Sequence, residues 1–133
     1  MKRIKGIEQV EQAIGKWSPR DLALIERLEL KPADEHAGST LVIAALFQPR
    51  AKSWPNFDRE MFRVAIAFDN VSDLCLKGFG GGAVQIMGFD IQFVGDRGME
   101  GIEYEIVDYE DGRIRFFCRD IRVLSVAPAA RQS

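Results

Sequence analysis

The sequence predicts an α+β protein, mainly antiparallel β, with an N-terminal helix followed by seven to eight strands in a sandwich or curved sheet. Three observations lead to this prediction. Apolar residues recur at helical spacing near the N-terminus. Apolar and polar residues alternate along several later stretches, and short turns rich in Gly, Asp and Asn separate these stretches. No alternation of strands with helices follows residue 40, which argues against a parallel βαβ sheet.

The helix is expected over roughly residues 6–16. Apolar residues recur there at spacings of three, four and three, at Ile7, Val10, Ile14 and Trp17. Gly15 lies near the expected end, where glycine commonly terminates a helix.

Residues 18–30 allow two interpretations. Ser18 and Asp21, with Pro19 between them, form a capping-box pattern that favours a helix. Leu residues in this stretch fit a helical stripe, but they also alternate as in a strand. The local pattern favours a helix, whereas the topology favours a strand. We therefore expect a helical turn at 18–21 that leads into a strand.

The strand over 40–48 is expected at the centre of a sheet. Its apolar run from Leu41 to Phe47 implies cover on both faces, with the helix on one side. The next strand begins at Phe62 and has a period of two, so its even-numbered apolar residues face the core. Later strands are expected over 71–79, with Leu74 and Leu76 inward, around 89–93 and around 102–106.

The hairpin at Glu110-Asp111-Gly112 allows a register to be predicted. A three-residue loop suits this sequence, because the glycine can adopt the left-handed conformation. That loop pairs Tyr104 with Cys118, Ile106 with Phe116 and Glu103 with Arg119. A two-residue loop would exchange the two faces of one strand, so the apolar pattern selects the three-residue loop. The last strand is expected over 121–126.

Length and charge restrict the class of protein. The 133 residues indicate one domain, 1–133, with a frayed tail from about residue 128. A formal net charge of −2 argues against a general nucleic-acid binder. The basic start is not followed by an apolar signal region, and no apolar run is long enough to span a membrane. A cytoplasmic location is therefore the expectation.

Catalytic and cofactor motifs are weak. The stretch 78–83 matches G-x-G-x-x-A, but Gly88 ends the following segment too early for the helix of a dinucleotide site. His36 is the only histidine, and no zinc spacing or GxSxG motif is present. We expect no enzyme, no cofactor and no metal site. Cys75 and Cys118 are expected to be buried thiols, unless the fold brings them close enough for a disulfide.

Charged residues are segregated along the chain. Residues 90–111 contain eight acids and one base, whereas residues 113–122 contain four Arg and one Asp. Hairpin pairing neutralises part of this charge, but three acids lie outside the hairpin: Asp90, Asp96 and Glu100. They form either a solvated loop face or an acidic patch that steers a basic partner.

Loop aromatics provide a second kind of candidate. Trp54 and Phe57 lie in a predicted loop, where aromatic side chains commonly anchor an interface. The alternative is that both side chains fold back and cap the sheet. We include both residues among the candidate partner-binding residues.

The order of elements resembles a known family. The residues that carry the resemblance are Gly15-Lys16-Trp17, Ser18-Pro19-Arg20-Asp21, Phe68-Asp69-Asn70-Val71, Leu74-Cys75-Leu76, Tyr104-Glu105-Ile106 and Ile114-Arg115-Phe116-Phe117-Cys118. Over about residues 6–126 they resemble the Immunity protein 50 family of bacterial polymorphic-toxin systems. The resemblance implies a strand after residue 21 and a cytoplasmic protein that binds and neutralises a cognate protein toxin. It implies no catalytic residues.

Three functional hypotheses follow. The first is a non-enzymatic protein that occludes a partner surface. The second is a small-molecule binder or enzyme within a curved sheet, which predicts buried Arg63, Gln85 or Glu105 beside a deep pocket. The third is a homo-oligomerising accessory domain joined through an exposed strand edge, with the oligomeric state left open.

Overall fold

The structure is a computed structural model that describes residues 4–15, 18, 21–32, 38–48, 60–78, 84–85, 88–95, 98, 101–108 and 113–129. Within these residues the chain forms one helix, α1 (Ile7–Ile14), and nine strands. The strands are β1 (Leu22–Lys31), β2 (Thr40–Phe47), β3 (Met61–Asp69), β4 (Ser72–Leu76), β5 (Val84–Gln85), β6 (Phe89–Phe93), β7 (Tyr104–Asp108), β8 (Ile114–Cys118) and β9 (Asp120–Ala129).

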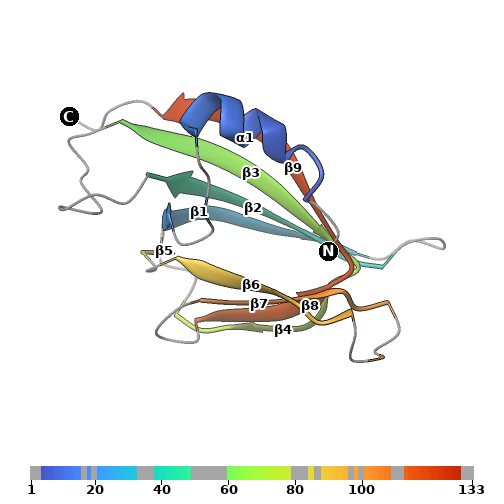
Figure 1. Ribbon diagram of the computed structural model, residues 1–133. Helices are drawn as coiled ribbons and strands as arrows, with labels where there is room; N and C mark the ends of the chain where they lie inside the picture. Colours follow the sequence, from blue (N-terminus) through green and yellow to red (C-terminus); the bar gives the residue numbers. More distant parts are fainter. Residues whose placement is uncertain are drawn as a thin grey trace.

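The strands form two sheets that lie one over the other (Figure 1). The first sheet has the order β5-β1-β2-β3-β9, and the second has the order β4-β8-β7-β6. All paired strands run antiparallel. The predicted class, α+β and mainly antiparallel with an N-terminal helix, is confirmed, and its two-sheet form is the sandwich.

The core lies between the two sheets. Phe68 of β3 is fully buried, and its ring meets Phe116 of β8 edge-on at 4.9 Å between centroids. Its ring also lies 6.3 Å from that of Phe89 of β6. Alternation along β3 buries Val64, Ile66 and Phe68 as predicted, because one side of each strand faces the opposite sheet.

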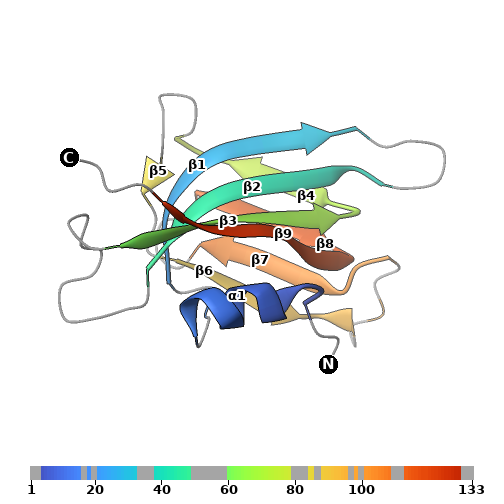
Figure 2. The ribbon, with the colours of Figure 1, turned by 90° about the horizontal axis from the view of Figure 1, so that it is seen from above.

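The predicted helix is confirmed, and it lies alongside β9 at the edge of the first sheet (Figure 2). Ile7 and Val10 are buried in the same apolar cluster as the two sheets. Gly15 ends the helix with a φ of 89°, a conformation that glycine adopts without steric cost. Before the helix, Lys5 forms a short parallel bridge with Arg122 of β9.

β2 is the central strand of the first sheet, and every residue from Leu41 to Phe47 is buried, as predicted. The helix packs mainly along β9 and not over β2, so the prediction that the helix covers one face of this central strand is wrong. On the outer side, Arg63 of β3 and Glu26 of β1 form an ion pair at 2.6 Å. Because β2 lies between their strands, this pair crosses its outer face.

The expected turn and strand after the helix are confirmed. Asp21 donates its backbone N–H to the carbonyl oxygen of Ser18 at 3.0 Å, which closes one helical turn. β1 then pairs with β2 from Leu22 onward. Two register shifts interrupt the pairing, so the leucines of this segment do not follow a strict period of two. That irregularity explains why the local pattern resembles a helix.

β4 is shorter than the predicted strand over 71–79. Asp73 has a φ of 52°, and the register with β8 shifts between Ser72 and Cys75. This bulge interrupts the alternation. Leu74 packs against the core as expected, whereas Leu76 is 41% exposed.

Two further differences concern strand ends. β5 follows the glycine-rich stretch 78–83, in a segment where no strand is predicted, and pairs with Leu24 and Ile25 of β1. β9 extends to Ala129, beyond the expected end of the last strand at residue 126. Pro128 lies opposite Phe62, and the strand tolerates it because β9 is at the edge of its sheet.

Candidate binding face on the second sheet

The β7–β8 hairpin has the predicted register. Tyr104 pairs with Cys118, and Ile106 pairs with Phe116. These four side chains are buried and face the first sheet. The loop residues 109–112 lie outside the described residues, but Asp108 at the loop entry accepts the backbone N–H of Ile114 at 3.2 Å. The pairing fixes which side chains point away from the core.

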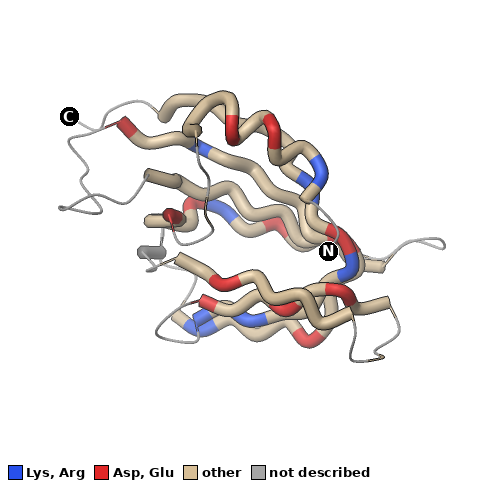
Figure 3. Tube along the Cα trace, in the orientation of Figure 1, with Lys and Arg blue, Asp and Glu red and all other residues tan. Residues whose placement is uncertain are grey.

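The outer face of the second sheet consists of the alternate side chains of three strands: Asp90, Gln92, Glu105, Val107, Arg115 and Phe117. They form two rows across the sheet, because Asp90 lies opposite Val107 and Gln92 lies opposite Glu105. Acidic and basic residues both lie on this sheet (Figure 3): the acids of the outer face are on β6 and β7, and Arg115 is on β8. This face is the candidate site, because it contains the one predicted partner-binding residue that the structure describes.

Arg115 organises the β8 side of the outer face. Its Nη2 lies 2.9 Å from Oε2 of Glu105, and its guanidinium carbon lies 5.9 Å from the centroid of the Phe117 ring. The Arg115 side chain is 57% exposed, so this ion pair contributes little to stability. Hairpin neutralisation of the acidic segment therefore occurs between Glu105 and Arg115, whereas Arg119 lies 3.9 Å from Asp120.

Asp90 has a different environment. Its Oδ2 accepts a hydrogen bond from Nε2 of Gln92 at 2.8 Å. An amide partner orients a carboxylate without neutralising it. Among the described residues, Asp90 is therefore the carboxylate of the outer face whose charge has no cationic partner.

The other predicted site residues are Asp96, Glu100, Trp54 and Phe57. All four lie outside the described residues, so their grouping with Asp90 stays a prediction. The exposed aromatic that the sequence did not single out is Phe93 of β6, which is 39% exposed and packs edge-on against Tyr104 at 6.0 Å. Its alternation predicts burial, but Phe93 lies at the end of the edge strand β6 and is exposed, whereas Phe89 at the start of this strand is buried.

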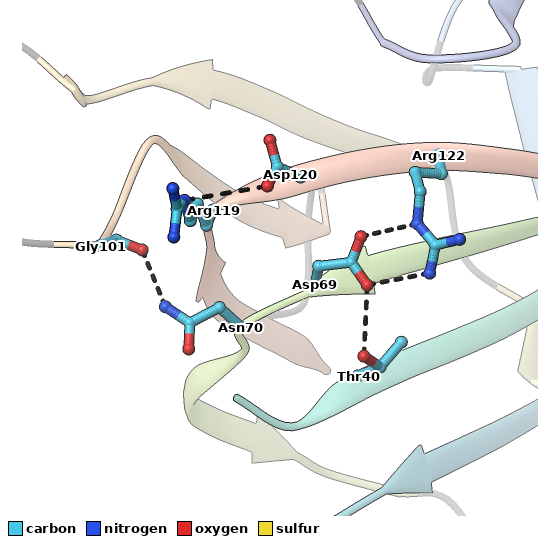
Figure 4. A network of polar contacts seen from close by, with 7 residues as sticks. All are labelled: Thr40, Asp69, Asn70, Gly101, Arg119, Asp120 and Arg122. Carbon is cyan, nitrogen blue, oxygen red and sulfur yellow. Dashed lines mark hydrogen bonds and ion pairs between the residues drawn. The ribbon is translucent and has the colours of Figure 1, made fainter. Parts of the chain in front are cut away.

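A second polar cluster lies where the chain passes between the sheets (Figure 4). Arg122 of β9 donates two hydrogen bonds to Asp69 of β3, at 2.6 and 2.9 Å, and Thr40 of β2 donates a third at 3.2 Å. The hydrogen bond from Arg122 is the main cause that lowers the pKa of the Asp69 carboxyl, against an opposing effect of burial. These hydrogen bonds link β2, β3 and β9 of the first sheet.

Asn70 continues this corner into the second sheet. Its φ of 57° is left-handed, which asparagine tolerates better than most residues. Its side-chain amide donates to the carbonyl oxygen of Gly101 at 3.0 Å, ahead of β7. Arg119 lies where the chain passes back from β8 of the second sheet to β9 of the first, and its backbone N–H donates to the carbonyl oxygen of Asp69 at 2.8 Å. We interpret the corner as structural, because its polar groups pair with one another and hold the second sheet in place.

The interior-site hypothesis predicts converging polar groups. Arg63 and Glu105 instead lie on the outer faces of different sheets, and each is engaged in an ion pair. The Gln85 side chain is outside what the structure describes. The described part of the chain contains no group of three His, Cys, Asp or Glu residues that could hold a metal ion.

Comparisons of the chain with protein families, with curated proteins and with solved structures found no match. Within the described ranges, no helix has the length and apolar character needed to cross a membrane.

The two thiols have different environments. Cys118 is buried as predicted, and burial is the main cause that raises the pKa of its thiol, with smaller effects from Asp120 and Asp69. Cys75 is exposed, so the prediction of burial is wrong there. The reason is the bulge in β4, after which Cys75 lies opposite Arg115 of the outer face. Both cysteines are free.

Thiol labelling should separate the two cysteines. A disulfide reagent at neutral pH should modify Cys75 rapidly and Cys118 only after unfolding, because reaction requires an accessible thiolate. Released chromophore, counted before and after denaturant, measures both reactions. In the Cys75→Ser variant the rapid phase should vanish, and a rapid phase that persists would contradict the burial of Cys118.

Proposed function

We propose that this protein is a non-enzymatic binding protein that docks a basic protein surface on the outer face of its second sheet and acts by occlusion. The observation that carries the proposal is Asp90. Its carboxylate is oriented by Gln92 but is not neutralised by a described cation, and it lies on a regular antiparallel sheet. A fixed charge of this kind steers association and selects the partner.

The Arg115–Phe117 pair supports the same proposal. Arginine and aromatic residues, phenylalanine included, are enriched in the cores of protein interfaces. Here the guanidinium stacks near the ring on the outer face, in the same sheet as Asp90. The acidic side chain of Asp90 and the aromatic ring of Phe117 therefore lie on the same surface. Trp54 and Phe57 are proposed as additional anchors.

We propose a cognate protein toxin as the partner and the cytoplasm as the location. Both proposals rest on the resemblance to the Immunity protein 50 family. The small-molecule alternative has less support, because Arg63 and Glu105 face away from the interior and are already paired.

The test is binding to the purified product of the gene that adjoins its own, measured by stopped-flow association over a range of salt. Asp90→Lys should slow association about 3- to 10-fold at low salt and weaken the salt dependence, since it reverses a steering charge. The same effect is expected when Asp96 and Glu100 are both replaced with Lys.

Glu29→Lys is the matched control. Glu29 is an exposed acid on β1 of the first sheet, so its replacement changes the net charge by the same amount away from the outer face. It should leave the association rate nearly unchanged. Equal slowing in both variants, or an unchanged rate for Asp90→Lys at low salt, would overturn the proposed site.

A further inference from the structure

The two sheets have four edge regions, and three of them are protected against pairing with another chain. β1 extends beyond its short pairing with β5 and has alternating charges over residues 26–31, which oppose edge pairing. β4 is interrupted by the bulge at Asp73. β9 contains Pro128 and is bridged by Lys5. Bulges, charges and proline are devices that prevent edge-to-edge association.

β6 is the fourth edge, and among its described residues the single charge of Asp90 is the one device of this kind. Five consecutive residues, Phe89 to Phe93, pair with β7 without a register shift. The strand reads Phe-Asp-Ile-Gln-Phe, which contains one charge and no proline. Ile91 is half-buried, and Gln92 and Phe93 are exposed. A regular apolar strand at a sheet edge is a template for pairing with another strand.

The hydrogen-bonding direction of β6 follows from its neighbour. Val94 donates its backbone N–H to the carbonyl oxygen of Glu103 at 2.7 Å, so the backbone polar groups of Val94 point toward β7. In an antiparallel ladder this direction alternates by residue, so the backbone N–H and C=O groups of Asp90 and Gln92 also point toward β7. The N–H and C=O groups of Phe89, Ile91 and Phe93 therefore point to the outer edge of the strand.

We propose that two copies of this chain pair through β6, antiparallel, about a two-fold axis at Ile91. In this register Ile91 lies opposite Ile91 of the partner subunit, and Phe89 lies opposite Phe93 of the partner subunit. All three outward-facing residues of each strand then pair with outward-facing residues, which forms about six backbone hydrogen bonds. The exposed Phe93 becomes covered by an aromatic neighbour.

The strand is self-complementary in charge as well as in shape. The two-fold register places Asp90 opposite Gln92 of the partner subunit, an acceptor opposite an amide donor. A shift of two residues in one direction would place the two Asp90 carboxylates opposite each other, which is unfavourable. A shift of one residue would join core-facing to outer-facing side chains. The sequence of β6 thus favours one symmetric register.

The product of this pairing is one continuous eight-stranded sheet, in which the four strands of each second sheet are joined. The two outer faces become one surface, because the two-fold axis is perpendicular to the sheet. The pairing does not require the proposed function, because it needs no toxin or other partner, although both proposals use Asp90 of β6.

The test changes the charge at Gln92, which is exposed and on the outer face. Gln92→Glu places a carboxylate opposite Asp90 twice in the dimer, so the dissociation constant should rise about 5- to 10-fold at low salt. Gln92→Lys places an ammonium there and should lower the dissociation constant. Sedimentation equilibrium from micromolar to millimolar concentration measures both changes.

Matched controls place the same two charges at Ser125, an exposed residue of β9 in the first sheet. They should leave the dissociation constant unchanged. A wild-type protein that stays monomeric to millimolar concentration would overturn the proposal, and so would shifts of the same sign for Gln92→Glu and Gln92→Lys.

Hydrogen exchange provides a second measurement that does not depend on a variant. The amides of Ile91 and Phe93 should become protected as the protein concentration rises, whereas those of Asp90 and Gln92 should be protected at every concentration. If a dimer forms while the amides of Ile91 and Phe93 exchange at an unchanged rate, its interface lies elsewhere and the proposal is wrong.

Discussion

Replacing Phe68 with alanine should lower the free energy of unfolding by about 3–5 kcal/mol, because it removes a buried ring and leaves a cavity. Phe68 has no exposed surface, and its ring contacts Phe116 and Phe89 of the opposite sheet. A domain of this size has a free energy of unfolding of only about 5–15 kcal/mol, so the substitution removes a large part of it. Urea unfolding followed by circular dichroism measures the loss.

Phe93→Ala serves as the matched control, since it removes the same ring from a side chain that is 39% exposed. Measured at low protein concentration, its loss should be less than half that of Phe68→Ala. Equal losses would show that the contacts of Phe68 do not join the two sheets as described.

Replacing Asp69 with asparagine should lower the free energy of unfolding by about 1–2 kcal/mol at neutral pH, because the amide has no negative charge and offers Arg122 one acceptor oxygen where the carboxylate offers two. Asp69 accepts from Arg122 and Thr40 at the corner between the sheets. The amide keeps the size of the side chain, so the loss reports on charge and hydrogen bonding and not on packing.

The pH dependence of this loss follows from the direction of the pKa shift. The pKa of Asp69 is lower in the folded protein than in the unfolded chain, mainly because Arg122 donates hydrogen bonds to the carboxylate. Its stabilising contribution is therefore complete above the unfolded pKa and is lost as the pH falls through the lower folded pKa. The difference between wild type and Asp69→Asn should shrink in acid.

Urea unfolding at several pH values between neutrality and about pH 3 measures this difference. Glu29→Gln, the same chemical change at an exposed acid of β1, should show a smaller loss at neutral pH. A loss for Asp69→Asn that stayed constant down to the lowest pH would contradict the role of the carboxylate charge.

The elements whose side chains repeat regularly could be predicted from the sequence. The alternation along β3 was sufficient to predict which of its side chains point inward, and the loop composition of the β7–β8 hairpin was sufficient to predict its register. Both are local properties, because a period of two assigns side chains to faces and a turn of known length assigns cross-strand partners.

The candidate site was predicted less completely. The segregation of acidic residues singled out Asp90, and the structure places it on the outer face of the second sheet. The pairing of Glu105 with Arg115 was missed, because the register allows both direct and diagonal partners for a long side chain. The exposure of Cys75 was missed because a bulge is not visible in the apolar pattern.

The class of this protein, its helix, the faces of its regular strands and the hairpin register could all be predicted, since these depend on spacing along the chain. The tertiary structure alone decided the order of the strands within the sheets. That order places β3 inside the first sheet, where Phe68 is buried, and β6 at an edge, where Phe93 at the end of the strand is exposed although Phe89 is buried. Two phenylalanines in similar alternating stretches differ because burial depends on neighbours that are distant in sequence.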